Sequence, residues 1–189
     1  MTGLDRFIQR LRIREAARYL RPGMRVLDIG CADGALADQV PGLDYVGLDP
    51  ALPPSLATHG LTGVGRRLVR GHFPDDVPAG PPFDAITLLA VLEHLDDGEQ
   101  ARLARGCADK LRPGGLLIVT VPAPIVDRIL DVLMFLRLVD GMATEEHHGF
   151  DVRRTPSVFG QAGLVCTVQR RFELGLNHLF VFENRSPPR

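Results

Sequence analysis

The sequence has few of the residues that mark secreted, disulfide-bonded or metal-binding proteins. Its 189 residues include three cysteines and no tryptophan. Cys31, Cys107 and Cys166 lie far apart and show neither a C-x-x-C nor a metal-ligand spacing. Because free cysteines of this kind are typical of a reducing compartment, we predict a cytoplasmic protein.

Long apolar runs and an excess of one charge are also missing. Residues 1–6 lack the basic stretch followed by an apolar one that begins a signal peptide. The longest apolar segment, Pro124 to Val139, is interrupted by charged residues and is too short to cross a bilayer. The net charge of −1 gives no electrostatic reason to bind nucleic acid or an anionic membrane. We therefore expect neither partner, and no membrane span.

What the sequence does contain is a strand, a tight turn and a helix between residues 25 and 39. An apolar run ends at Gly30, and Gly34 precedes a helix-forming stretch at 35–39. In a parallel sheet, such a turn holds a nucleoside-bearing ligand, because glycine permits close approach and the helix start offers free amides. Asp49 ends the next apolar run, where a carboxylate can accept bonds from both ribose hydroxyls.

The composition of this loop separates the possible nucleoside ligands. Alanines, Ala32 and Ala35, replace the second and third glycines of the dinucleotide pattern G-x-G-x-x-G. Asp28 and Asp33 would also repel phosphates, so an NAD-dependent oxidoreductase is the less favoured alternative. S-adenosylmethionine carries a ribose and an adenine without phosphate, and its methionyl end bears an ammonium and a sulfonium. An acidic loop suits that molecule.

Five stretches, in this order, resemble the class I S-adenosylmethionine-dependent methyltransferases that act on small molecules. They are residues 25–35, 45–49, 69–73, 83–95 and 111–122. The alternation of strands and helices independently predicts a parallel sheet covered on both faces. With the resemblance, the expected α/β fold is a doubly wound, mostly parallel, seven-stranded Rossmann-like sheet with an antiparallel last strand.

Two positions depart from the family pattern. Ala32 stands where the family usually has glycine, a change that the fold should tolerate if the backbone angle there is ordinary. His72 stands where an acidic residue or asparagine commonly meets the adenine amino group, so that contact is not carried over.

The resemblance assigns roles toward S-adenosylmethionine and its product, S-adenosylhomocysteine. Gly30 and Gly34 allow close approach, and Asp49 takes the ribose hydroxyls. Asp28 holds the loop and faces the methionyl ammonium, although a purely structural carboxylate is the alternative. His72 and Phe73 flank the adenine, with Phe73 alternatively a core residue. The predicted cofactor-binding residues are Asp28, Gly30, Cys31, Ala32, Gly34, Asp49, Pro50, His72, Phe73, Leu89 and Ala90.

Methyl transfer requires mainly positioning and the exclusion of water, and a base only if the nucleophile arrives protonated. His94 follows the fourth strand, and His147 and His148 follow the fifth strand and an apolar helix, so these three are the candidate bases. Helix-start chemistry is the alternative for Glu93 and His94. A metal site at Glu93, His94 and His147 is disfavoured, because Ala90 occupies the first position of the E-x-x-E-H pattern. We predict no metal.

The whole chain, residues 1–189, is expected to form one methyltransferase domain. Residues 1–22 would form an N-terminal helix or flap, 23–122 the cofactor-binding half, and 123–189 the acceptor-side helices and a closing hairpin. The apolar helix at 125–139 would face the core, an apolar acceptor or a second subunit. We predict in-line methyl transfer to a small-molecule acceptor. The alternative is a noncatalytic S-adenosylmethionine-binding regulator, and the oligomeric state is open.

The pattern also predicts boundaries for the individual elements. Helices are expected at 4–20, 53–60, after Asp96 or Asp97, and at 153–162, and the later strands at 61–70, 83–90, 116–121, 165–172 and 177–183.

Overall fold

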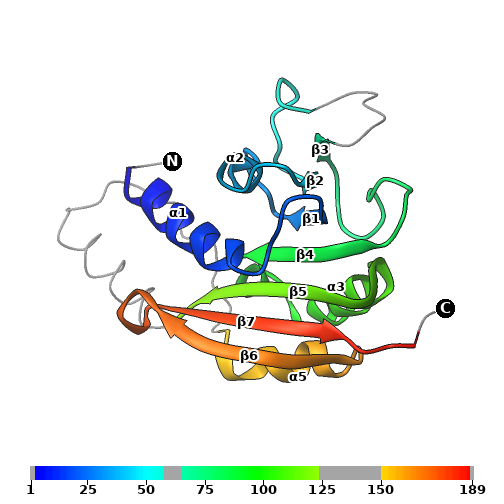
Figure 1. The fold of residues 1–189 in the computed structure, drawn as a ribbon. Helices are drawn as coiled ribbons and strands as arrows, with labels where there is room; N and C mark the ends of the chain where they lie inside the picture. Colours follow the sequence, from blue (N-terminus) through cyan, green and yellow to red (C-terminus); the bar gives the residue numbers. More distant parts are fainter. Residues whose placement is uncertain (1–2, 58–64, 124–149, 188–189) are drawn as a thin grey trace.

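A computed structural model describes residues 3–57, 65–123 and 150–187. Its centre is a seven-stranded sheet with the strand order β3-β2-β1-β4-β5-β7-β6 (Figure 1). Strands β1 to β5 pair in parallel, and β7 is antiparallel to both of its neighbours, β5 and β6. The predicted sheet is confirmed. The strands are β1 (Arg25–Ile29), β2 (Asp44–Asp49), β3 (Arg66–Arg70), β4 (Phe83–Leu89), β5 (Leu111–Pro122), β6 (Leu164–Phe172) and β7 (Asn177–Asn184).

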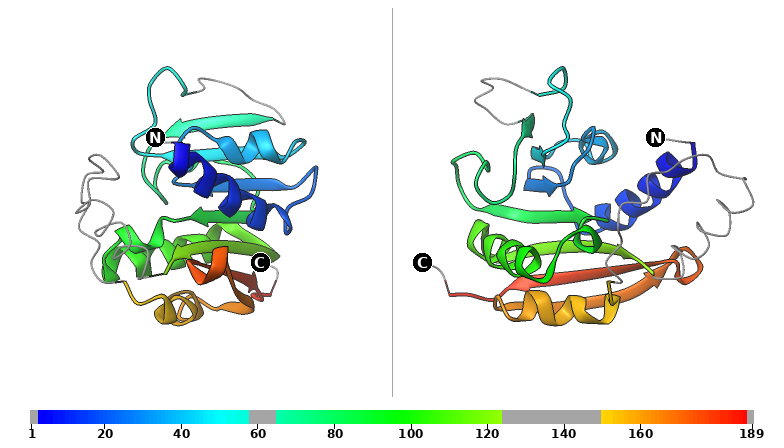
Figure 2. Two further views of the ribbon diagram at one scale, coloured as in Figure 1. Left: turned by 90° about the vertical axis from the view of Figure 1, so that its left-hand side faces the viewer. Right: turned by 180° about the vertical axis from the view of Figure 1, so that it is seen from behind.

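Helices cover both faces of the sheet, as the alternating pattern predicts (Figures 1 and 2). Helices α1 (Gly3–Ala17) and α2 (Ala35–Gln39) lie on one face, and α3 (Asp97–Lys110) and α5 (Thr155–Gly160) lie on the other. Neighbouring residues of β1 therefore enter different cores: Val26 joins the cluster under α1, and Leu27 joins the cluster under α3. A strand buried on both faces needs apolar residues at consecutive positions, which is why β1 and β4 read as continuous apolar runs.

Three short 3-10 turns complete the described elements: η1 (Leu92–His94), η2 (Val152–Arg154) and η3 (Glu173–Gly175). Between η1 and α3, the predicted helix cap is confirmed as a capping box. The Asp96 carboxylate accepts from the Glu99 amide at 2.8 Å, and the Glu99 carboxylate accepts from the Asp96 amide at 2.9 Å. This pairing fixes where α3 begins, close to the end of β4.

Helix α1 packs over β4 and β5 and against α2. Two polar contacts tie it to the closing hairpin: Arg12 Nε donates to Asn177 Oδ1 at 3.1 Å, and Glu15 forms an ion pair with Arg170. Because β5 and β7 are neighbours, these contacts hold α1 near the carboxyl ends of the parallel strands. The predicted flap movement of this helix stays a prediction.

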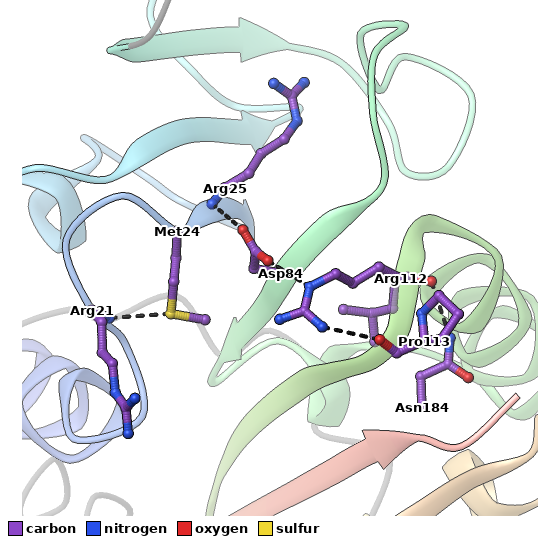
Figure 3. A network of polar contacts seen from close by, with 8 residues as sticks. Arg21, Met24, Arg25, Asp84, Arg112, Pro113 and Asn184 are labelled. Atoms are coloured by element: carbon purple, nitrogen blue, oxygen red, sulfur yellow. Dashed lines mark hydrogen bonds and ion pairs between the residues drawn. The ribbon is translucent and has the colours of Figure 1, made fainter. Parts of the chain in front are cut away.

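The opposite edge of the sheet, where the parallel strands begin, is held by Asp84 (Figure 3). Its carboxylate accepts from the Arg25 amide at 2.7 Å and from Arg112 Nε at 2.6 Å. Partial burial opposes ionisation, but these hydrogen bonds and the Arg112 charge outweigh it and lower the pKa of Asp84. One carboxylate thus joins the first residues of β1, β4 and β5.

Several predicted boundaries were wrong, mostly at element ends. Helix α1 ends at Ala17 rather than at 20, where residues 18–20 form a turn, and the helix predicted at 53–60 is a turn over its described part, 53–57. Backbone pairing extends β5 back to Leu111, which lies opposite Phe83. The remaining differences are that β4 stops at Leu89, that β3 begins at Arg66 within the described residues, and that the helix predicted at 153–162 divides into η2 and α5.

The apolar helix predicted at 125–139 falls outside the described residues. Within the described ranges, no helix is both long enough and apolar enough to cross a membrane. The domain limits and the cytoplasmic location stay predictions.

Candidate functional site

The loop between β1 and α2 adopts a left-handed backbone at three of its positions. Gly30, Ala32 and Gly34 have φ angles of 73°, 50° and 76°. The Gly30 amide donates to the Leu48 carbonyl at 2.8 Å, which fastens the loop to the end of β2. The condition under which alanine was expected to be tolerated at position 32, an ordinary backbone angle, is therefore not met. An alanine in this region costs roughly 1–2 kcal/mol relative to the right-handed conformation.

The two glycines of the loop are required by packing as well as by their angles. A Cβ atom at Gly30 would lie 2.5 Å from Val91 Cγ2, and one at Gly34 would lie 2.7 Å from Arg66 Nη2. These neighbours belong to the segment after β4 and to β3. The predicted reason for these glycines is close approach by a ligand. Close approach of the protein's own side chains is a second reason.

Asp49 links the loop after β1 to the loop after β2. One carboxylate oxygen accepts from the Ala32 amide at 2.8 Å, and the other accepts from the Ala51 amide at 2.8 Å. Each oxygen has two lone pairs, so each can still accept one hydrogen bond from a ligand hydroxyl. The carboxylate is thus held in place without being saturated.

Asp28 lies deeper, at 4% exposure, and its partners are uncharged. Tyr45 Oη donates to one oxygen at 2.7 Å, and Thr87 Oγ1 donates to the other at 2.6 Å. Burial raises the pKa of Asp28 to about 6, and the nearby Asp49 charge adds to the rise, while the two hydroxyl bonds oppose it. This carboxylate lacks a cationic partner among the described residues, so a bound cation would stabilise its ionised form.

Two cavities open at the carboxyl edge of the sheet, where the parallel strands end. One lies on each face of the sheet. The cavity on the α3 face has a volume of about 470 Å³, and the one on the α1 face about 50 Å³. Gly30 lines both, so they meet at the left-handed loop. The α3-face cavity is lined by Ile29, Leu48, Pro50, Gly71, His72, Phe73, Asp75, Asp76, Val91, Leu95, Glu99, Arg102 and Leu103, and the α1-face cavity by Gln9, Arg12, Ile13, Asp28, Cys31, Leu36 and Leu89.

Arg12 is the residue of this site that sequence reasoning missed. It lines the α1-face cavity together with Asp28. Its Nε is taken by Asn177, whose own amide nitrogen donates to Glu173. Burial lowers the pKa of Arg12, and the charges of Glu93 and Glu173 oppose that shift. Little in the sequence singles it out, because Arg12 is one of several arginines at polar positions of the same helix.

Five more of the predicted cofactor-binding residues lie at the end of β4 or in the loops after β2, β3 and β4. Pro50, His72 and Phe73 line the α3-face cavity. A Cβ atom at Gly106 of α3 would lie 2.6 Å from the Phe73 ring, so this ring packs on the helix, and its role toward the adenine stays a prediction. At the end of β4, Leu89 lines the α1-face cavity, and Ala90 has a φ angle of 60°.

Cys31 is buried, and burial together with the charges of Asp28 and Asp49 raises its pKa, which disfavours the nucleophilic thiolate. Of the predicted bases, His94 is exposed at the end of η1, whereas His147 and His148 lie outside the described residues. Within the ranges that the structure describes, no three side chains of the metal-ligating types come together.

A seven-stranded sheet of this order, with an acidic loop after β1 and a carboxylate at the end of β2, defines the class I S-adenosylmethionine-dependent methyltransferases. Residues 2–164 match the family described as "Methyltransferase domain", and the chain belongs to that family.

Relatives and solved structures agree with this assignment. The ubiquinone biosynthesis O-methyltransferase of Xanthomonas campestris pv. campestris (strain B100) is 35% identical over 111 residues, which cover 56% of this chain and 46% of the relative. The chain therefore spans about half the length of that relative. The fold resembles the pyocyanin biosynthetic protein PhzM, with a TM-score of 0.69, 21% identity, and coverage of 93% of this chain and 55% of that one. It also resembles magnesium protoporphyrin IX methyltransferase (ChlM) from Synechocystis PCC 6803 with bound SAH, with a TM-score of 0.61, 17% identity, and coverage of 97% and 84%.

Proposed function

We propose that this protein transfers a methyl group from S-adenosylmethionine to an oxygen of a small-molecule acceptor. The observation that carries the proposal is the pair of cavities that meet at Gly30, with Asp28 beside one and Asp49 between the loops. The donor is an elongated molecule with an adenine at one end and an amino acid at the other. The oxygen nucleophile is inferred from the relative named as an O-methyltransferase.

The residues present fit the two ends of this donor. The α3-face cavity is mostly apolar and offers Pro50 and Phe73 to a purine, and Asp49 would accept bonds from the ribose hydroxyls. In the α1-face cavity, the Asp28 carboxylate would face the methionyl ammonium, and the Arg12 guanidinium would face the methionyl carboxylate. A zwitterion thus meets one group of each opposite charge.

Little further chemistry is required of the protein. When bound, S-adenosylmethionine supplies a methyl group already activated by the sulfonium. The chain's own residues orient the donor, and α1 covers the methionyl end from water. An acceptor hydroxyl must lose a proton, and His94, the last residue of the η1 turn that follows β4, is the proposed base.

The function is tested by incubating the full chain with S-adenosylmethionine and a panel of phenols and catechols, and by measuring methylated product by mass spectrometry. Binding of S-adenosylhomocysteine is measured in parallel by calorimetry. Tight binding without transfer to any acceptor would favour the noncatalytic regulator. Thermal stabilisation by NAD alone would contradict the proposal.

The role of His94 has a separate test. We expect His94→Ala to lower kcat at least about tenfold while the Kd for S-adenosylhomocysteine stays unchanged, because a base acts on the acceptor and not on the donor. His94→Gln, which keeps much of the size without the basicity, should be equally slow. Wild-type turnover in both variants would remove His94 from the reaction.

A further inference from the structure

The loop after β3 places a carboxylate next to the position where the family's acidic residue is missing. His72 occupies that position, but Asp76 folds back onto it. The Asp76 amide donates to the His72 carbonyl at 3.0 Å, and Asp76 Oδ2 accepts from the His72 amide at 2.8 Å. The Asp76 Cβ lies where a side chain at Gly71 would stand, which explains the glycine there.

Four charged side chains line the α3-face cavity, and they differ in the partners they have. Asp75 and Arg102 form an ion pair, and Glu99 belongs to the capping box of α3. Asp76 uses only Oδ2, and no described residue hydrogen-bonds its Oδ1. Unlike the Asp75 and Glu99 carboxylates, the Asp76 carboxylate is bonded to the residue at the family's adenine position, and its Oδ1 remains open to a ligand donor.

We propose that Asp76 accepts a hydrogen bond from the adenine 6-amino group and so selects a 6-aminopurine over a 6-oxopurine. This inference rests on the proposed function, because it assumes that the adenine occupies the α3-face cavity. An ionised carboxylate only accepts hydrogen bonds. A 6-oxo group is also an acceptor. In a hypoxanthine bound in this cavity, its oxygen would therefore face the Asp76 oxygen with no hydrogen between them.

The neighbouring His72 cannot provide the same selection. A neutral imidazole carries one donor and one acceptor nitrogen, and a ring flip offers either one to the ligand. The Asp76 carboxylate is held by the His72 amide and has no such choice. Asp76 is accordingly the specificity-determining residue, although it stands four positions after the family's site.

The bond to the His72 amide makes an unusually direct substitution available. In Asp76→Asn, the amide oxygen must accept from that N–H, because the NH₂ group cannot. The NH₂ is then left to face the ligand as a donor. The variant should bind S-adenosylhomocysteine about tenfold more weakly than wild type and S-inosylhomocysteine, its 6-oxo analogue, more tightly. The preference for the amino compound should fall by at least about tenfold.

Calorimetric titration of wild type, Asp76→Asn and the matched control Asp75→Asn with both compounds tests this inference. Asp75→Asn changes a carboxylate that lines the same cavity but is paired with Arg102, so its preference should equal that of wild type. The proposal is overturned if wild type itself binds both compounds equally, a result that needs no variant to fold. It is also overturned if His72→Ala, and not Asp76→Asn, removes the preference. Failure of wild type to bind either compound would instead contradict the proposed function.

Discussion

One aspartate lies near each end of the parallel strands, which we call the amino edge and the carboxyl edge of the sheet. The two carboxylates have opposite kinds of partner. At the amino edge, Asp84 receives an amide and a guanidinium, and its pKa is lowered (Figure 3). At the carboxyl edge, Asp28 receives two neutral hydroxyls, and burial raises its pKa to about 6. The first carboxylate is compensated within the protein. The second has no cationic partner among the described residues, and this is the basis of its proposed role toward the ligand ammonium.

The backbone shows the same division. At the turns of the amino edge, the left-handed positions are glycines: Gly23, Gly42 and Gly114. At the carboxyl edge, two such positions are alanines: Ala32, within the loop after β1, and Ala90, directly after β4. Strain and uncompensated charge are thus found together at the edge that carries the candidate site, which is where functional sites commonly hold them.

Neutralising Asp28 tests the difference between the two aspartates most directly. We expect Asp28→Asn to weaken binding of S-adenosylhomocysteine by about 3 kcal/mol, because the ligand ammonium loses a buried charged partner. The free energy of unfolding of the ligand-free protein should stay equal or rise, because a buried charge is removed. Calorimetry and urea unfolding measure the two effects. A large loss of stability with normal affinity would make Asp28 a structural carboxylate.

The second test varies pH and uses the raised pKa of Asp28. The ligand ammonium favours the ionised carboxylate, so affinity for S-adenosylhomocysteine should rise about tenfold per pH unit below about pH 6 and level off above it. The ligand-free protein should behave in the opposite way. Its folded state holds the proton more tightly than the unfolded state, so its stability falls by up to about 3 kcal/mol as pH rises from about 4 to about 6.

Titrations between pH 5 and 8 in buffers of different ionisation enthalpy measure both the affinity and the protons released on binding. The matched control is Asp28→Asn, in which the slope below pH 6 should disappear. A slope that persists in this variant would assign the titration to another group.

At the amino edge, Asp84→Ala should lower stability and leave ligand affinity unchanged, the opposite of what is expected for Asp28→Asn. The variant loses hydrogen bonds to the Arg25 amide and to Arg112, so we expect a loss of about 1–2 kcal/mol in the free energy of unfolding. The Kd for S-adenosylhomocysteine should not change, because the residue lies at the far edge of the sheet. Denaturant unfolding and calorimetry on the same preparation measure the two quantities. Weaker ligand binding by a variant that is fully folded would show that the two edges are coupled.

How far the sequence could predict each edge depends on whether the signal is local. The strands, the acidic loop after β1 and the carboxylate at Asp49 follow from short patterns, and the structure places them together. The arginine whose side chain bonds Asp84 is Arg112, 28 positions away, and the partner of Arg12 is Asn177, 165 positions away. Polar pairs at such separations depend on strand order and register, and nothing in the local sequence distinguishes these arginines from their neighbours.

The smallest expected effect concerns Ala32, whose left-handed angle no sequence pattern revealed. Ala32→Gly removes a cost of roughly 1–2 kcal/mol but makes the unfolded chain more flexible by about 0.4–1 kcal/mol, so a net gain of about 0.5–1 kcal/mol in stability is expected. Ala35→Gly in α2, three positions on, is the matched control. It replaces a helical alanine and should destabilise the protein by about 1 kcal/mol. Urea unfolding of both variants gives the two signs, and a loss of stability in both would mean that the loop at the carboxyl edge holds no releasable strain.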